Sequence, residues 1–138
     1  MPINRTQLQQ VAQLRLDEAE ALLLANHPSG AYYLAGYAVE CALKACIAKQ
    51  TREHDFPEKD VVNSSYTHNL KALLSVAGLE QDLRSAEADK GFALNWVIVT
   101  TWKEDSRYAT HSALEAENLL LAISDKSRGV LQWIKKYW

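Results

Sequence analysis

Apolar residues recur along this chain every three or four positions, in stretches separated by polar or proline- and glycine-containing breaks. This spacing predicts helices that each bury one face. Helices are expected at about 6–25, 30–49, 67–77, 80–100, and from 112 nearly to the C-terminus. Residues 50–66 have no helical period and are expected to form a polar connection. The pattern therefore predicts an all-α protein: an antiparallel up-and-down bundle of four long helices and one short helix.

Capping sequences support several of these helix starts. Thr6 with Gln9 and Ser112 with Glu115 fit the capping box, in which side chain and backbone bond to each other across the first turn. A Pro-Ser-Gly sequence ends the first helix, and Ser29 within it is the expected N-cap of the next one.

The apolar stripes also identify side chains that are expected to stay outside the core. In the 80–100 helix the expected buried residues are Leu83, Ala86, Leu94, Val97 and Ile98. Of the four tryptophans, Trp96 and Trp133 fall away from these stripes on a helical wheel. Exposed tryptophans are typical of binding surfaces, so this pair indicates a surface for a partner.

Size and composition narrow the possible classes. With 138 residues and a net charge of −2, the chain is expected to form one domain, without the overall positive charge of many nucleic-acid-binding proteins. No apolar run approaches the roughly 20 residues of a membrane span, and the first residues do not resemble a signal peptide, so a cytoplasmic protein is expected. Cys41 and Cys46 are expected to be buried thiols, and no metal site or cofactor is indicated.

The expected helix at 30–49 combines small residues with one unusual polar strip. Alanine, cysteine and valine fill two neighbouring rows, so other helices can approach closely on both. The remaining arc carries Tyr33, Gly36, Tyr37, Glu40 and Lys44. A central helix with one polar and aromatic seam is expected, and this seam is the first place to look for function.

Three segments in a fixed order give the chain a family resemblance. They are YLAGYAVECALKA at 33–45, THNLKALL at 67–74 and SRY at 106–108, followed by a helix that ends in WIKK. Together they resemble the HEPN domain family, named for its occurrence in higher eukaryotes and prokaryotes and for nucleotide binding. The resemblance covers roughly residues 8–136 and implies an up-and-down helical bundle that is often a homodimer.

The resemblance also implies partners and an activity. Many prokaryotic members work with a small nucleotidyltransferase or belong to toxin–antitoxin pairs. Others are metal-independent ribonucleases that use an Arg and a His separated by four to six residues. Here Arg107 and His111 have three residues between them, and Tyr108 stands where the family usually has a polar residue. Both precede the helix that begins near Ser112, so their spacing does not fix their relative position.

Glu40 and Arg107 each allow two interpretations. Glu40 either accepts hydrogen bonds from Arg107 and orients it, or forms an ordinary pair with Lys44 one turn away, worth about 0.2–0.5 kcal/mol. Arg107 precedes a helix N-terminus, where a cation is unfavourable unless an anion holds it. It is expected either to bridge to Glu40, Glu104 or Asp105, or to bind an anionic ligand.

The two histidines are also open to two interpretations each. His111 is either a general acid–base group for RNA cleavage or a solvent-facing loop residue. His68 either helps to bind an anion at the start of its helix or has a packing role there.

The preferred hypothesis is a nucleotide- or partner-binding bundle that works with a nucleotidyltransferase or a toxin–antitoxin partner. Its site is formed by Glu40, Lys44, Arg107, Tyr33, Tyr37 and Tyr108, with His68 matching a histidine of the family pattern. One alternative is a metal-independent ribonuclease with Arg107 and His111 as catalytic residues, so nucleotide or RNA is the expected ligand class. The other is an oligomerisation or scaffold module.

Overall fold

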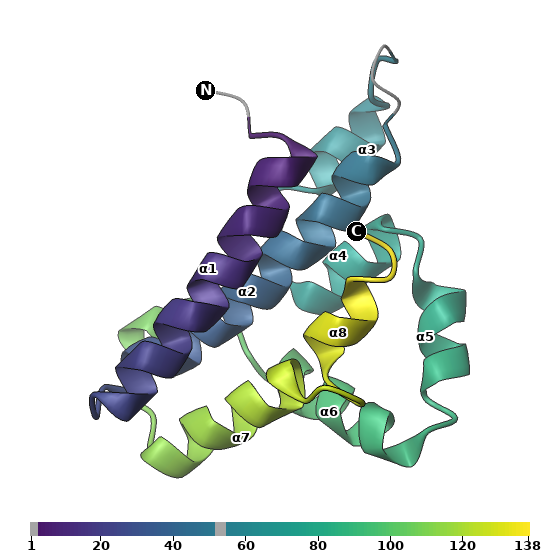
Figure 1. Ribbon diagram of the computed structural model, residues 1–138. Coiled ribbons are helices and arrows are strands. Elements are labelled where there is room, and N and C mark those ends of the chain that lie inside the picture. The colour runs from purple at the N-terminus through teal and green to yellow at the C-terminus, as the bar shows by residue number, and fades with distance from the viewer. Residues whose placement is uncertain (1–2, 52–54) are drawn as a thin grey trace.

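The computed structural model describes residues 3–51 and 55–138, and every regular element within these ranges is helical (Figure 1). The elements are α1 (Arg5–Leu24), α2 (Pro28–Lys49), α3 (Lys59–Ser64), α4 (Leu70–Val76), α5 (Glu80–Ala86), α6 (Lys90–Thr100), the 3-10 helix η1 (Glu104–Tyr108), α7 (Ala113–Ser124) and α8 (Val130–Ile134). The prediction of an all-α protein is confirmed. The expected set of four long helices and one short helix is wrong, because two of the expected long helices are each divided into two shorter ones.

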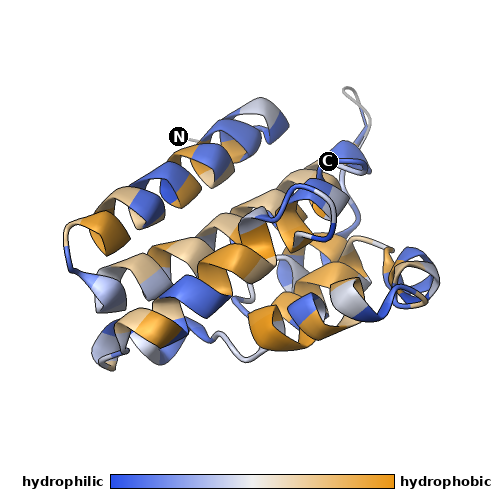
Figure 2. Cartoon of the chain, turned by 60° about the horizontal axis from the view of Figure 1, so that its bottom comes forward, coloured by the Kyte–Doolittle hydropathy of each residue, from blue (hydrophilic) through white to orange (hydrophobic). Residues whose placement is uncertain are grey.

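Helices α1 and α2 lie side by side along most of their lengths, with the chain turning back between them (Figure 1). The capping box of α1 is formed by Asn4 and Gln7, so the box expected at Thr6 and Gln9 is wrong. Asparagine is favoured at the N-cap position, and Asn4 starts the helix two residues before the expected cap, Thr6. Figure 2 shows polar and apolar residues alternating along α1, as expected for a helix with one face in the core.

Helix α2 is the central element of the bundle. It packs against α1, α4, η1, α7 and α8, and small buried residues such as Ala35, Ala38 and Ala42 allow these close approaches. Its N-cap is His27, with proline in the first turn, so the prediction of Ser29 as the cap is wrong. The cysteines of α2 are buried as expected, and burial raises the pKa of both the Cys41 and Cys46 thiols to about 11.

The expected helix at 80–100 is divided into α5 and α6. Asp89 interrupts it by acting as N-cap of α6, where its side chain accepts from the backbone N–H groups of Gly91 and Phe92. Because α6 starts anew, its buried stripe is Phe92, Trp96 and Val99. Leu94 and Val97, expected in the core, are 61% and 57% exposed.

The expected last helix is also divided, into α7 and α8. The capping box of Ser112 and Glu115 is confirmed at the start of α7. The helix stops at Asp125, whose carboxylate accepts from the backbone N–H groups of Ser127 and Arg128. Trp133 in α8 is buried against Phe92, with ring centroids 5.3 Å apart. With Trp96 buried as well, the predicted tryptophan surface for a partner is wrong.

The connection after α2 contains an unexpected short helix, α3, while residues 52–54 of the same connection lie outside the described residues. It leads to α4, which buries Leu70, Leu73 and Leu74 against the core. Gly78 ends this segment with a φ of 72°, a left-handed conformation that favours glycine. Within the described residues, no helix has both the length and the apolar content required to cross a bilayer.

Candidate functional site

Glu40 is the starting point of the site because it is a buried carboxylate on the central helix. It is 2% exposed, and its carboxylate meets two donors. Lys44 Nζ lies 3.3 Å from Oε2, and His68 Nδ1 lies 3.0 Å and 3.1 Å from the two oxygens. A buried acid needs such partners to offset its lost hydration. The Glu40–Lys44 pair therefore differs from an ordinary pair on a helix surface, because its carboxylate is buried.

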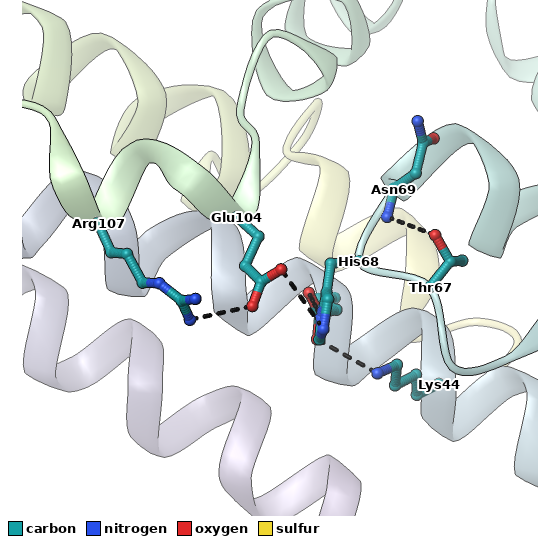
Figure 3. A network of polar contacts seen from close by, with 7 residues as sticks. Lys44, Thr67, His68, Asn69, Glu104 and Arg107 are labelled. Atoms are coloured by element: carbon teal, nitrogen blue, oxygen red, sulfur yellow. Dashed lines mark hydrogen bonds and ion pairs between the residues drawn. The ribbon is translucent and has the colours of Figure 1, made fainter.

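His68 connects Glu40 to the chain segment of η1. Its Nδ1 faces Glu40, and its Nε2 lies 3.5 Å from Glu104 Oε2 (Figure 3). Because a carboxylate only accepts, the Nδ1 atom carries a proton in this arrangement. Glu40 thus fixes the orientation of the ring, which is the way a carboxylate orients a functional histidine.

The local backbone places His68 immediately before α4. Asn69 is the N-cap of α4 and accepts from Ala72 N at 3.0 Å, and Thr67 Oγ1 accepts from Asn69 N at 3.1 Å. These side chains occupy N–H groups at the start of α4. The N–H groups of Asn69 and Ala72 are therefore not available to an anion beside His68, and the role of His68 in anion binding stays a prediction.

Arg107 lies at the other end of the polar chain. Its Nη1 donates to Glu104 Oε1 at 3.0 Å, and its guanidinium lies over the Tyr108 ring, 4.8 Å from the centroid. Glu104 and Arg107 face each other because residues three apart coincide on a 3-10 helix. Hydrogen bonds with Tyr108 and then Tyr33 raise the pKa of Arg107.

The predicted bridge from Arg107 to Glu40 is wrong, whereas the bridge to Glu104 is confirmed. Glu40 and Arg107 are instead joined through His68 and Glu104, as Figure 3 shows for the labelled residues. The reason is the position of Glu104 on η1. Its carboxylate lies beside His68 and also binds Arg107, so Arg107 does not contact Glu40 directly. The Arg107 side chain remains 43% exposed.

The tyrosines of the predicted site gather beside this chain. Tyr33 stacks on Tyr37 with centroids 6.1 Å apart, and Tyr33 also lies 6.1 Å from the ring of Trp102. Trp102 packs directly over Gly36, where a Cβ atom would lie closer than 3.0 Å to three atoms of the indole. The small residue in the seam of α2 thus makes room for the tryptophan.

A polar cleft opens next to the chain of charged residues. It has a volume of about 630 Å³, and its walls include His68, Lys71, Trp102, Lys103 and Glu104. Trp102 is 3% exposed, and its Nε1–H group has no hydrogen-bond partner among the described residues. The cleft therefore combines two lysines, an oriented histidine and an unpaired buried donor.

His111 lies in a different environment. Its ring stacks on Tyr32, with centroids 3.7 Å apart, its Nδ1 lies 3.2 Å from Glu115 Oε2, and its backbone N donates to Ser29 Oγ. With a side chain only 13% exposed, it is not the solvent-facing loop residue that was expected. Among the described residues, His111 and Arg107 have no contact partner in common.

Four residues of the cleft wall were not predicted from the sequence to bind a ligand. They are Glu104, Trp102, Lys71 and Lys103. Glu104 was considered only as a bridge for Arg107, and Trp102 only as one of four tryptophans. One signal was available, because a buried acid on α2 and a glycine four residues earlier both imply close neighbours from elsewhere in the chain.

No metal centre is found in this region. Among the residues that the structure describes, no group of three or more His, Cys, Asp or Glu side chains is arranged to hold a metal ion. Comparison of the chain with protein-family models, curated proteins and solved structures finds no match. The likeness to the HEPN family therefore rests on the sequence motifs and stays a prediction.

Proposed function

We propose that this chain is a nucleotide-binding module with the up-and-down bundle of the HEPN type, and that the cleft beside α4 and η1 receives the phosphate group. The observation that carries the proposal is the buried, unpaired indole N–H of Trp102 in the cleft wall. A buried donor without an acceptor costs about 1–3 kcal/mol. An oxygen atom of a ligand would satisfy it.

The cleft wall offers two cations to an anionic ligand group, next to the carboxylates of Glu104 and Asp105. Lys71 and Lys103 line it, and His68 stands beside them with its ring held by Glu40. Hydrogen bonds from cations to phosphate oxygens are stronger than bonds between neutral groups. The volume of about 630 Å³ also lies in the range of small-molecule sites, roughly 300–1,000 Å³.

Arg107 does not itself line the cleft, but it bonds to the wall residue Glu104, and its partly exposed side chain is expected to strengthen nucleotide binding because a guanidinium can bind a phosphate through two parallel hydrogen bonds. Arg107→Ala should weaken AMP, ATP or GTP binding roughly 10- to 100-fold, as expected for one lost charged hydrogen bond. Isothermal titration calorimetry measures this effect.

A matched control for that experiment is Arg84→Ala. Arg84 is also exposed and also bonds to a residue three positions earlier, Gln81, but it lies on α5. Equal loss in both variants would show only a general charge effect. Absence of binding heat with all three nucleotides would reject the proposal and leave partner binding or scaffolding.

Glu104 is expected to oppose phosphate binding, because its carboxylate lies between Arg107 and His68. Glu104→Gln removes one negative charge from the cleft and should tighten nucleotide binding about fivefold, given that the site is partly exposed and screened. Competition titrations at low and high salt measure this change, which should shrink as salt rises. Unchanged or weaker affinity would place the phosphate outside this part of the cleft.

A metal-independent ribonuclease using Arg107 and His111 is the second function that the family resemblance implies. It receives less support here, because Arg107 contacts Glu104 and Tyr108 while His111 contacts Tyr32, Glu115 and Ser29. Cleavage would need both groups at one phosphate.

The proposal includes a nucleotidyltransferase-type or toxin–antitoxin partner and a homodimer, since the resemblance implies both. The tryptophans do not support a scaffold role, because Trp96 and Trp133 are buried. Apolar surface is available instead at Leu94 and Val97 of α6 and at Leu114 and Leu121 of α7, which are all more than half exposed.

A further inference from the structure

A second cavity lies on the other side of the segment that begins η1. Its volume is about 420 Å³, and its walls include Tyr32, Ser106, Tyr108 and His111. Lys103 and Asp105 line both this cavity and the larger cleft. The two hollows therefore share part of their walls.

Two polar atoms in this wall have no hydrogen-bond partner among the described residues. They are Ser106 Oγ and His111 Nε2, and Ser106 is only 8% exposed. Each is shielded from bulk water, so each carries the cost of an unpaired buried polar group. Unpaired polar groups of this kind in a native protein call for an explanation, and a ligand is one.

The chemistry of the two atoms is complementary to a heterocyclic base. His111 Nδ1 faces the carboxylate of Glu115, so the proton lies on Nδ1 and Nε2 is an acceptor in the neutral ring. The Ser106 hydroxyl can donate or accept. The edge of a nucleobase presents N–H donors next to acceptor atoms, which matches this pair of wall groups.

Aromatic side chains form part of the cavity wall, where Tyr32 and His111 stack on each other. The rings of Tyr32 and His111 are nearly parallel, with an interplanar angle of 12°. Tyr108 also lines the cavity and is 80% exposed, so the ring face that Arg107 does not cover is available to a base. Aromatic side chains that stack on unpaired bases are common in nucleotide recognition.

We propose that this second cavity binds the base of the nucleotide, resting on the proposed function that places its phosphate in the cleft. Ser106 and His111 bond to the base edge, and Lys103 lies at the junction between base and phosphate. Because the serine hydroxyl adapts to donor or acceptor, the pocket recognises a base without strong preference among the four.

The test compares three probes by calorimetry: AMP, ribose 5-phosphate and adenosine. In Ser106→Ala, AMP and adenosine should each bind about three- to tenfold more weakly, while ribose 5-phosphate is unchanged. His111→Phe keeps a ring beside Tyr32 but removes the Nε2 acceptor, and it should act in the same direction. The matched control is Ser124→Ala, because the Ser124 hydroxyl already bonds to the Leu120 carbonyl.

Stability provides a second readout that a purely structural role would not reproduce. Ser106→Ala removes an unpaired buried oxygen, so the variant without ligand should melt at the same or a higher temperature while its AMP affinity falls. A lower melting temperature together with unchanged affinity would overturn the base pocket.

The probes separate the two proposals. Equal AMP affinity in wild type, Ser106→Ala and His111→Phe would overturn the base pocket and leave phosphate binding in place. Adenosine binding that depends on Ser106, without any binding of ribose 5-phosphate, would support the pocket and reject the phosphate site. No binding of any probe would overturn both.

Discussion

Gly36→Ala is expected to lower the free energy of unfolding by about 2–3 kcal/mol, as overpacking of a well-packed core does. The new Cβ atom would lie closer than 3.0 Å to three ring atoms of Trp102, which is 3% exposed and has little room to move. The helical preference of alanine over glycine, about 0.5–1 kcal/mol, offsets only part of this cost. Thermal melting should fall by roughly 5–12 °C.

The control for this prediction is another glycine of the same helix. At Gly30 a Cβ atom would meet only the end of the Leu22 side chain, at 3.2 Å, which can shift. Gly30→Ala should therefore leave the melting temperature nearly unchanged or raise it slightly. Equal effects at Gly30 and Gly36 would contradict the close packing of Trp102 on α2. Because Trp102 forms part of the cleft wall, Gly36→Ala should also weaken nucleotide binding.

Glu40→Ala is expected to cost about 2–3 kcal/mol of stability. Removing one partner of a fully buried ion pair costs roughly 3–5 kcal/mol, and the loss is smaller here because water reaches the side chains of both partners. Lys44 and His68 are 23% and 42% exposed at their side chains. The truncation also leaves a void beside the central helix. Urea unfolding monitored by circular dichroism measures the change.

Two further variants test the cause of that loss. Glu40→Gln keeps the shape and one acceptor oxygen, so its cost should be clearly smaller. A double-mutant cycle of Glu40→Ala with His68→Ala should give a coupling energy of at least about 0.5 kcal/mol, since the side chains are in contact. Additive effects would show that Glu40 stabilises the fold without His68. The surface change Glu20→Ala should alter stability by less than about 0.5 kcal/mol.

The helices were predictable where capping and periodicity agree. The start of α7 is one case, because the Ser112–Glu115 box and the apolar stripe coincide. The break between α7 and α8 was missed since the stripe continues in phase on both sides, with Ile123 and Val130 both buried. Periodicity alone cannot reveal an interruption of this kind. The side-chain bonds of Asp125 create it.

The misplaced tryptophans have the same origin. The wheel position of Trp133 was derived for one continuous helix with one buried stripe, but α8 is a separate short helix in which Val130, Leu131, Trp133 and Ile134 are all buried. Trp96 was misassigned in a similar way after the break at Asp89. Two missed helix breaks therefore led to the prediction that two core residues lie on the surface.

The site was only partly predictable. Glu40, Lys44, Tyr33 and Tyr37 share one helix, so their grouping follows from its period. His68 and Arg107 belong to segments outside α2, and their approach to it depends on tertiary packing. The sequence indicated that Arg107 needs an anion but could not choose among three carboxylates, since loop spacing fixes no distance.

The two thiols of α2 have a practical consequence. Thiolates are the reactive species, and burial raises the pKa of both cysteines to about 11, so alkylating reagents should reach them only after the surrounding helices separate. The rate of alkylation in the native protein thus reports how often the central helix becomes exposed. Ligand binding at the cleft becomes measurable through slower labelling, without any label on the ligand.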